Sequence, residues 1–217
     1  MGMIRLLIFD FDGTLGDTRA NIVLTMTQTL KSLGYPVAGE NEIASTIGLP
    51  LEEGFRRLIP GISEMDTLEC AKTYREIFEI NRKQLVPKLF PHVKETLEAL
   101  FERGIGMTIA SSRQSRSLNG FLNDMEIAGF ISYVVGADSV TMAKPHPEPV
   151  LKTLAAMGVP PEEALVVGDM PVDILMGKRA GTMTCGVIYG NSSRKELEEA
   201  GADHIIDDLP TLLEIIQ

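Results

Sequence analysis

The chain has 217 residues, enough to bury a sizeable core in one domain with an insertion or in two small domains. Hydrophobic residues make up 44% of the sequence and charged residues 23%, which is ordinary for soluble globular proteins. The formal net charge of -10 argues against a nucleic-acid-binding surface, because binding to a phosphate backbone depends on clustered Lys and Arg. A small phosphate compound stays compatible with this charge, since it needs only a local cation.

The sequence shows no pattern of a disulfide framework, a zinc site or a membrane span. Cys70 and Cys185 are its only cysteines, and they lie far apart. No apolar run reaches membrane-spanning length, and aspartates stand where a signal peptide would continue its apolar core. We therefore expect a cytoplasmic protein, a monomer or a homodimer, that binds neither a membrane nor a nucleic acid.

The first predicted element is a strand from Met3 to Phe9. Its residues are apolar except for Arg5, as in a strand buried on both faces of a parallel sheet. Asp10 follows at the carboxyl end, where open α/β sheets bind their ligands, and Gly13 permits a sharp turn. We expect the alternation of side chains to turn Asp10 and Asp12 toward one site.

The same Asp-x-Asp-Gly sequence has a simpler explanation, a turn that carries solvated acids, and the motif alone does not exclude it. A calcium-binding EF-hand loop is excluded. In that alignment Ile8 and Arg19 would fill the first and twelfth loop positions, and neither offers a usable side-chain ligand.

The next part of the chain is predicted to be entirely helical. Gly34, Gly48-Leu49-Pro50 and Pro60-Gly61 separate its helices, and no strand is expected between residues 35 and 86. The predicted helices are Arg19 to Leu33, Glu40 to Ile47, Leu51 to Leu58 and Asp66 to Leu85.

From Pro87 onward, strands and helices alternate, which indicates a parallel sheet covered on both faces. The N-terminal strand belongs to this sheet. We therefore expect a Rossmann-like α/β core from residues 1–15 and 91–217, with residues 16–90 inserted as an all-helical cap domain. The joints, near 15–18 and 86–91, are candidate hinges. The predicted strands are Ile105 to Ala110, Tyr133 to Val135, Ala164 to Val167, Met183 to Ile188 and His204 to Ile206. The predicted helices are Pro91 to Arg103, Arg113 to Asp124, Pro147 to Met157, Val172 to Ala180, Arg194 to Ala200 and Leu209 to Ile215.

Residues with reactive side chains stand in four predicted loops, and these loops are expected to lie along one edge of the sheet. Besides Asp10 and Asp12, they are Ser111 before a predicted helix N-terminus, Lys144 in Lys-Pro-His-Pro-Glu, and Asp169 with Asp173 in Gly-Asp-Met-Pro-Val-Asp. Each has a plain structural explanation: Ser111 and Asp173 are good helix caps, Lys144 suits a solvated surface, and Asp169 suits a turn. Their joint arrangement favours a common site.

These residue types meet the needs of phosphoryl transfer. A carboxylate that attacks an anionic phosphate is repelled by about 4 kcal/mol per charge pair at close range. Mg²⁺ held by Asp10 and Asp169, together with the Lys144 ammonium, would offset that repulsion. Ser111 and nearby backbone N–H groups could hydrogen-bond the phosphoryl oxygens.

With these motifs in place, the chain resembles the haloacid dehalogenase superfamily, and within it the phosphatases of the phosphoglycolate phosphatase type with a helical cap. Asp-Phe-Asp-Gly-Thr-Leu at 10–15 resembles the first family motif, and Ser111, Lys144 and Gly-Asp-x-x-x-Asp at 168–173 resemble the other three. The resemblance implies that Asp10 is the nucleophile and Asp12 the general acid and base. It also implies phosphate binding by Ser111, Ser112 and Lys144, and Mg²⁺ binding by Asp10, the backbone carbonyl of Asp12, Asp169 and Asp173, the last as a ligand or as a partner of one.

The function implied by this resemblance is Mg²⁺-dependent hydrolysis of a small-molecule phosphate monoester through an aspartyl-phosphate. Asp12 favours phosphoryl transfer over dehalogenation, because displacing halide needs no proton donor. A β-phosphoglucomutase-like phosphotransferase is an alternative, although its His-rich sequence is not seen in residues 18–27. A pyrophosphatase and a non-catalytic phosphate-binding regulatory domain are further alternatives. Ser112, Arg113 and Met170 depart from the usual family residues, so the motifs do not identify one substrate.

The expected cap would select the substrate by closing over the site. We expect its loop from Thr46 through Gly48 to Arg57 to reach the leaving group. Arg56 or Arg57 could bind a carboxylate or a second phosphate, although both also suit the solvated face of a helix.

Overall fold

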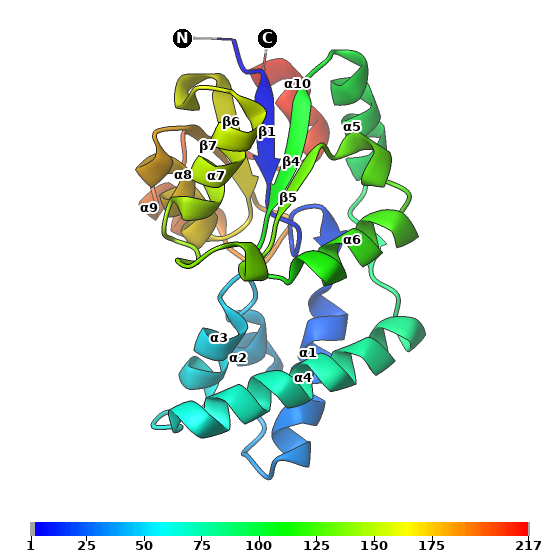
Figure 1. Ribbon diagram of the computed structural model, residues 1–217, viewed down its shortest axis with the longest axis vertical. Coiled ribbons are helices and arrows are strands. Elements are labelled where there is room, and N and C mark those ends of the chain that lie inside the picture. The colour runs from blue at the N-terminus through cyan, green and yellow to red at the C-terminus, as the bar shows by residue number, and fades with distance from the viewer. Residues whose placement is uncertain (1–2, 217) are drawn as a thin grey trace.

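The computed structural model describes residues 3–216 (Figure 1). Its main sheet contains β1 (Leu6–Phe9), β4 (Gly106–Ala110), β5 (Tyr133–Val135), β6 (Ala164–Gly168), β7 (Met183–Val187) and β8 (His204–Ile206). All neighbours are parallel, in the order β5-β4-β1-β6-β7-β8. The predicted Rossmann-like α/β class is therefore confirmed.

The helices alternate with these strands, apart from four that follow one another near the N-terminus. The α-helices are α1 (Arg19–Ser32), α2 (Glu40–Ala44), α3 (Leu51–Leu58), α4 (Glu64–Gln84), α5 (Val93–Glu102), α6 (Ser115–Asp124), α7 (Glu148–Met157), α8 (Pro171–Ala180), α9 (Arg194–Glu199) and α10 (Leu212–Ile215). Short 3-10 helices are η1 (Ala128–Phe130), η2 (Ala137–Ser139), η3 (Pro161–Glu163) and η4 (Leu209–Thr211). None of the helices within residues 3–216 is long and apolar enough to cross a membrane.

Strand β1 lies at the centre of the sheet and is buried on both faces, as its apolar sequence predicts. Leu6 and Ile8 pack in the layer that includes Val150 of α7 and Met176 of α8. Leu7 and Phe9 belong to the opposite cluster, together with residues of α5 and α10. The strand is shorter than predicted, since it begins at Leu6 and not at Met3.

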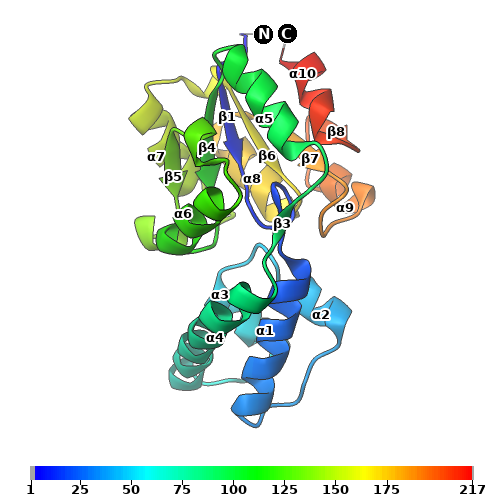
Figure 2. The same ribbon diagram turned by 90° about the vertical axis from the view of Figure 1, so that its right-hand side faces the viewer.

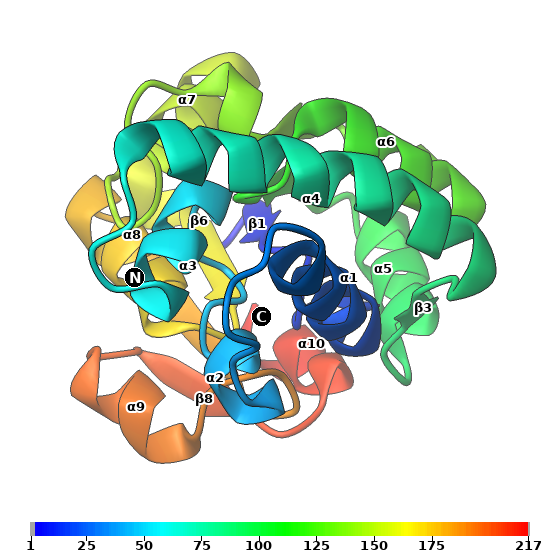
Figure 3. The same cartoon turned by 90° about the horizontal axis from the view of Figure 1, so that it is seen from below.

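Helices α1 to α4 form a separate bundle, the helical segment, beyond the carboxyl ends of the strands (Figure 1, Figure 2). Helix α4 packs along α1 and α3. The view from below places these four helices in front of β1 and β6 (Figure 3). The helical segment therefore covers the sheet edge on which the sequence motifs converge.

A run of aromatic rings joins the helical segment to the sheet domain. Phe55 and Tyr74 meet edge to face, and Tyr74 stacks on Phe78. Phe78 of α4 meets the edge of Phe121 of α6 at 6.0 Å between ring centroids, and Phe121 stacks on Phe11. Aromatic pairs of this kind add stabilisation beyond the burial of their area. The contact of Phe78 with Phe121 thus holds the two parts of the chain together beside the sheet edge.

Two short strands that the sequence did not predict connect the helical segment to the sheet domain. Strand β2 (Gly16–Asp17) pairs antiparallel with β3 (Lys88–Leu89), and the Phe90 N–H donates to the Leu15 carbonyl at 3.0 Å. This ribbon lies at the two predicted joints. Strands of two residues are too short to leave an alternating pattern, which explains why sequence analysis missed them.

Candidate active site

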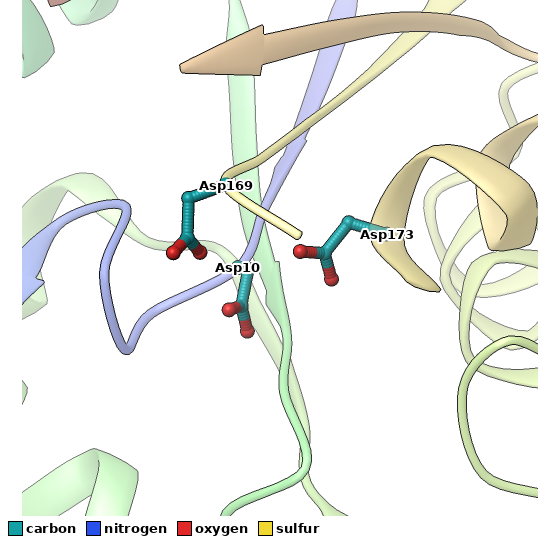
Figure 4. Close-up of side chains that lie close together, drawn as sticks. All are labelled: Asp10, Asp169 and Asp173. Atoms are coloured by element: carbon teal, nitrogen blue, oxygen red, sulfur yellow. The ribbon is translucent and has the colours of Figure 1, made fainter. Parts of the chain in front are cut away.

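The topology brings three buried carboxylates together at the sheet edge. Asp10 follows β1, Asp169 follows the neighbouring strand β6, and Asp173 lies in the first turn of α8. One oxygen from each lies within 4.8 Å of the others (Figure 4). All three side chains are almost completely buried. The predicted convergence of Asp10, Asp169 and Asp173 is therefore present in the structure.

Lys144 enters this cluster from the loop between η2 and α7. Its Nζ donates to Asp10 Oδ1 at 2.7 Å and to Asp173 Oδ1 at 2.6 Å, and its side chain is only 2% exposed. Burial by itself would lower the pKa of Lys144, but the two carboxylates raise it above its usual range. The plain alternative of a solvated surface lysine is therefore wrong.

Asp169 is held by three hydrogen bonds from two loops. Thr14 Oγ1 donates to Oδ1 at 3.1 Å, while the backbone N–H and the Nδ2 of Asn191 donate to Oδ2 at 2.8 and 2.9 Å. Burial raises the pKa of Asp169 to about 7, the charge of Asp173 adds to that rise, and the bonds from Asn191 and Thr14 oppose it. Sequence analysis singled out neither Thr14 nor Asn191.

Two glycines let backbone approach the Asp169 carboxylate. Gly13 has φ +88°, and a Cβ atom there would overlap Asp169 Oδ2. A Cβ at Gly190 would overlap both Asp169 Cβ and the Gly13 carbonyl oxygen. No side chain fits at either position, so Gly13 serves both the turn and this close approach.

The cluster has the donors that a divalent cation needs. Asp10 Oδ2 is buried and has no hydrogen-bond partner within residues 3–216. Burial raises the pKa of Asp10 to about 8, Lys144 opposes that rise, and the charges of Asp173 and Asp169 add to it. Three carboxylates facing a single ammonium leave an excess of negative charge, and carboxylate oxygens are the ligands that Mg²⁺ prefers. The residues present therefore fit a divalent metal ion.

The raised pKa values of Asp10 and Asp169 predict a pH-dependent effect of metal on stability. An aspartate ordinarily has a pKa of 3.8, so the metal-free folded protein binds more protons than the unfolded chain until the pH passes about 8. The contribution of the two groups to the unfolding free energy therefore falls as pH rises through this window. Mg²⁺ binds the deprotonated carboxylates, so the stabilisation that it gives should be larger at pH 8 than at pH 5 by a few kcal/mol, since a tenfold change in proton affinity corresponds to about 1.4 kcal/mol.

This prediction is checked by urea unfolding at pH 5, 6, 7 and 8, once with EDTA and once with a fixed excess of Mg²⁺. Comparing the two curves at each pH removes the titration of groups away from the site. An equal gain from Mg²⁺ at pH 5 and pH 8 would mean that the carboxylates are already charged at the lower pH.

The Asp12 carboxylate is bound by an arginine and a threonine. Because β1 ends at Phe9, the alternation of the strand does not extend to Asp12, which lies in the following turn. Its carboxylate accepts from Arg113 Nε and Nη2 at 3.0 and 2.6 Å and from Thr18 Oγ1 at 2.7 Å. Thr18 is the N-cap residue of α1, but its hydroxyl donates to Asp12 and makes no cap hydrogen bond.

The two serines after β4 have different surroundings. The Ser111 hydroxyl accepts from the Arg113 N–H at 3.3 Å, whereas Ser112 Oγ donates to the Gly48 carbonyl at 2.7 Å. Ser112 therefore links the sheet domain to the loop of the helical segment that was expected to approach the site. Helix α6 begins at Ser115, not at Arg113 as predicted, so Ser111 does not stand directly at a helix N-terminus.

A cavity of about 510 Å³ lies between the helical segment and the sheet domain, beside Asp12. Gly48 lines it, as do three arginines, which are Arg75, Arg113 and Arg116. The arginines chosen from the sequence are not among the lining residues: Arg56 is exposed and pairs with Glu53 and Glu64, and Arg57 is also exposed. The structure therefore brings Gly48 to the candidate site, but neither Arg56 nor Arg57.

The family model for haloacid dehalogenase-like hydrolases matches residues 7–187. The chain belongs to this family. Among relatives of this hydrolase, the pyrophosphatase PpaX of Oceanobacillus iheyensis is 34% identical over 98% of this chain and 97% of its own length. The phosphoglycolate phosphatase of Aquifex aeolicus is 34% identical over 86% of each chain.

The fold comparison agrees with the sequence comparison. The crystal structure of a haloacid dehalogenase-like hydrolase from Bacteroides fragilis is 31% identical, covers 96% of this chain and 99% of its own, and has a TM-score of 0.87. The predicted superfamily and the predicted phosphatase class of enzyme are therefore confirmed.

Proposed function

We propose that this haloacid dehalogenase-like hydrolase cleaves a phosphate monoester of a small metabolite, with Asp10 as nucleophile and Mg²⁺ as cofactor. The observation that carries the proposal is the buried cluster around Asp10. One Asp10 oxygen is fixed by Lys144, and the other, Oδ2, has no partner within residues 3–216. The Asp10 carboxylate lies beside those of Asp169 and Asp173. This arrangement leaves an oriented carboxylate free to attack.

The proposed reaction has two steps. An Asp10 carboxylate oxygen forms a bond to phosphorus while the ester P–O bond breaks, and the leaving oxygen takes a proton from Asp12. Water then attacks the aspartyl-phosphate, gives its proton to Asp12, and releases phosphate and the Asp10 carboxylate. Asp12 thus regains the proton that it gave to the leaving oxygen.

The other site residues would position the phosphoryl group and balance its charge. Lys144 would neutralise charge next to Asp10, and the Ser111 hydroxyl and Ser112 N–H would donate to phosphoryl oxygens. Asp10, Asp169 and the Asp12 carbonyl would hold Mg²⁺, which supplies charge stabilisation when bound, and Asp173 would bind it or hold Lys144.

We further propose that the helical segment is the substrate-selecting cap. Residues 1–15 and 91–217 would form the catalytic core and residues 16–90 the cap, with the β2–β3 ribbon as hinge. Support comes from the cavity beside Asp12, which residues of both parts line. The cytoplasmic location and the monomeric or homodimeric state stay predictions.

A pyrophosphatase activity is the second candidate. It is favoured by the similarity to the pyrophosphatase PpaX over 98% of this chain, and by the arginines that line the cavity. A guanidinium binds a phosphate or a carboxylate equally well, so the cavity suits either leaving group.

The experiment that tests the proposed function measures hydrolysis of p-nitrophenyl phosphate with and without Mg²⁺. We expect turnover with Mg²⁺, loss of at least about 10³-fold after EDTA treatment, and recovery when Mg²⁺ is restored. We then measure kcat/KM for phosphate release from four substrates and rank them by this value. The substrates are phosphoglycolate, pyrophosphate, a nucleoside monophosphate and a sugar phosphate. Turnover that persists unchanged in EDTA would contradict the metal-dependent mechanism.

A further inference from the structure

The proposed proton donor, Asp12, is bound in a buried ion pair. Arg113 binds Asp12 through two parallel contacts, Nε to Oδ2 and Nη2 to Oδ1, and the two side chains are only 8% and 10% exposed. Such a two-pronged pair fixes the orientation of the carboxylate as well as its distance. Before Asp12 can serve the leaving oxygen, its carboxyl group has to leave this arginine.

The arginine itself is fixed where the two parts of the chain meet. Its guanidinium carbon lies 4.7 Å from the ring centroid of Phe78 on α4 and 5.0 Å from that of Phe121 on α6. Nη1 also donates to Ser117 Oγ at 3.3 Å. With cation–π contacts to two rings and a hydrogen bond to α6, the guanidinium is held in place independently of Asp12.

Both members of the pair line the 510 Å³ cavity, so a group that enters this cavity can contact them directly. Arg116 lines the same cavity and makes no ion pair with a carboxylate in the part of the chain that the structure describes. A carboxylate or phosphate on the substrate has the geometry to take the place of Asp12 on Arg113. A neutral leaving group cannot, because it offers no charge to replace the one that departs.

We propose that Arg113 is a positioning residue that releases the Asp12 side chain when a second anionic group, carried by the leaving group of the substrate, pairs with its guanidinium. This inference rests on the proposed function and narrows its substrate class to phosphate compounds whose leaving group bears a carboxylate or a phosphate. One charge pair is exchanged for another, so Arg113 keeps a partner throughout. The freed Asp12 carboxylate takes up a proton from solvent and can then give it to the leaving oxygen, so the proton donor becomes available only over a matching substrate.

The mechanism distinguishes Arg113 from a residue that only binds substrate. A binding residue would act mainly on KM, since it would hold the ground state and the transition state alike. Release of Asp12 acts on proton transfer to the leaving oxygen, so it should appear in kcat. Release of Asp12 should raise kcat more for alkoxide leaving groups, which need a proton, than for p-nitrophenolate, which leaves without one.

The test uses two phosphate esters of nearly equal size, phosphoglycolate and ethyl phosphate, which differ in the carboxylate. We expect the wild-type protein to favour phosphoglycolate by at least about 100-fold in kcat/KM, mostly through kcat. Arg113→Met should reduce this preference at least tenfold, by slowing phosphoglycolate and by speeding ethyl phosphate once Asp12 is no longer held. Arg113→Lys keeps the charge without the two-pronged geometry and should give an intermediate preference.

Arg82→Met is the matched control, because Arg82 also lies over the Phe121 ring, at 5.8 Å, but has no contact with Asp12. It should leave the preference for phosphoglycolate within about twofold of wild type. If Arg113→Met slows both esters by the same factor, Arg113 is only structural, and if it raises only KM for phosphoglycolate, it is only a binding residue. Either result overturns the inference. If the Met variant does not fold, the Arg113→Lys variant provides the test, and a preference for phosphoglycolate equal to that of wild type then overturns the inference.

The failure of the proposed function gives a different result. In that case the wild-type protein would show no Mg²⁺-dependent hydrolysis of p-nitrophenyl phosphate, a substrate that needs neither Arg113 nor a proton donor for its leaving group. That outcome overturns the proposed function and this inference with it.

Discussion

Replacing Asp10 with asparagine is expected to lower kcat/KM for p-nitrophenyl phosphate by about 10⁴-fold or more, without loss of the fold. An amide oxygen is not a nucleophile toward a phosphoryl group, and the amide offers one ligand oxygen fewer to a metal ion. The amide oxygen can still accept from Lys144. Because burial and the charges of Asp173 and Asp169 disfavour the ionised form of Asp10, the metal-free Asp10→Asn variant should unfold at a temperature at least as high as the wild-type protein.

Steady-state kinetics and thermal unfolding in EDTA check this prediction together. Asp17→Asn is a suitable control, since Asp17 is an exposed carboxylate in the same connection of the chain. It should retain activity within about twofold of wild type. If Asp10→Asn kept more than a hundredth of the activity, another group would have to be the nucleophile.

Replacing Lys144 with methionine is expected to affect both stability and activity. The Lys144 ammonium contacts Asp10 and Asp173, and all three side chains are no more than 2% exposed. Methionine would leave two buried carboxylates without their cation, and breaking a buried pair in this way costs about 3–5 kcal/mol of unfolding free energy. Activity should fall by about 10³-fold, because the positive charge beside the attacking oxygen is lost.

Urea unfolding with EDTA and with Mg²⁺ measures the effect of Lys144→Met on stability. Mg²⁺ should restore part of the lost stability, since it supplies positive charge to the same carboxylates. Lys152→Met is the control: Lys152 pairs with Glu148 at the surface and is 46% exposed, and such pairs contribute about 1 kcal/mol or less. A Lys144 variant as stable as the Lys152 variant would contradict the view that the buried ammonium balances the cluster.

The residues that sequence analysis placed correctly are those fixed by strand order. Asp10 and Asp169 each follow a fully buried apolar strand, and two such strands in a parallel sheet end at the same edge. Lys144 could be included because its motif resembles that of a known family. Side chains whose position follows from the backbone of a central strand are therefore accessible to sequence analysis.

The residues that were missed depend on loop paths and on side-chain partners. Asn191 reaches Asp169 from the connection after β7, and no periodic pattern specifies the path of that connection. Arg113 was noted only as a departure from the family pattern, since the sequence cannot show that its guanidinium turns toward Asp12. Arg56 was misplaced because Gly54 and Phe55 are the buried residues of α3, which leaves Arg56 on the outer side of the helix.

The β2–β3 ribbon has a consequence for how such enzymes diversify. The chain leaves the sheet domain at Gly16 and returns at Leu89, and these two residues are direct partners in the ribbon. A segment inserted between them begins and ends at nearly the same point in space, so its size and shape do not require the sheet to change. Helices of another length or number could be exchanged at this junction while the reacting groups stay where they are, which would let new substrates be acquired without rebuilding the chemistry.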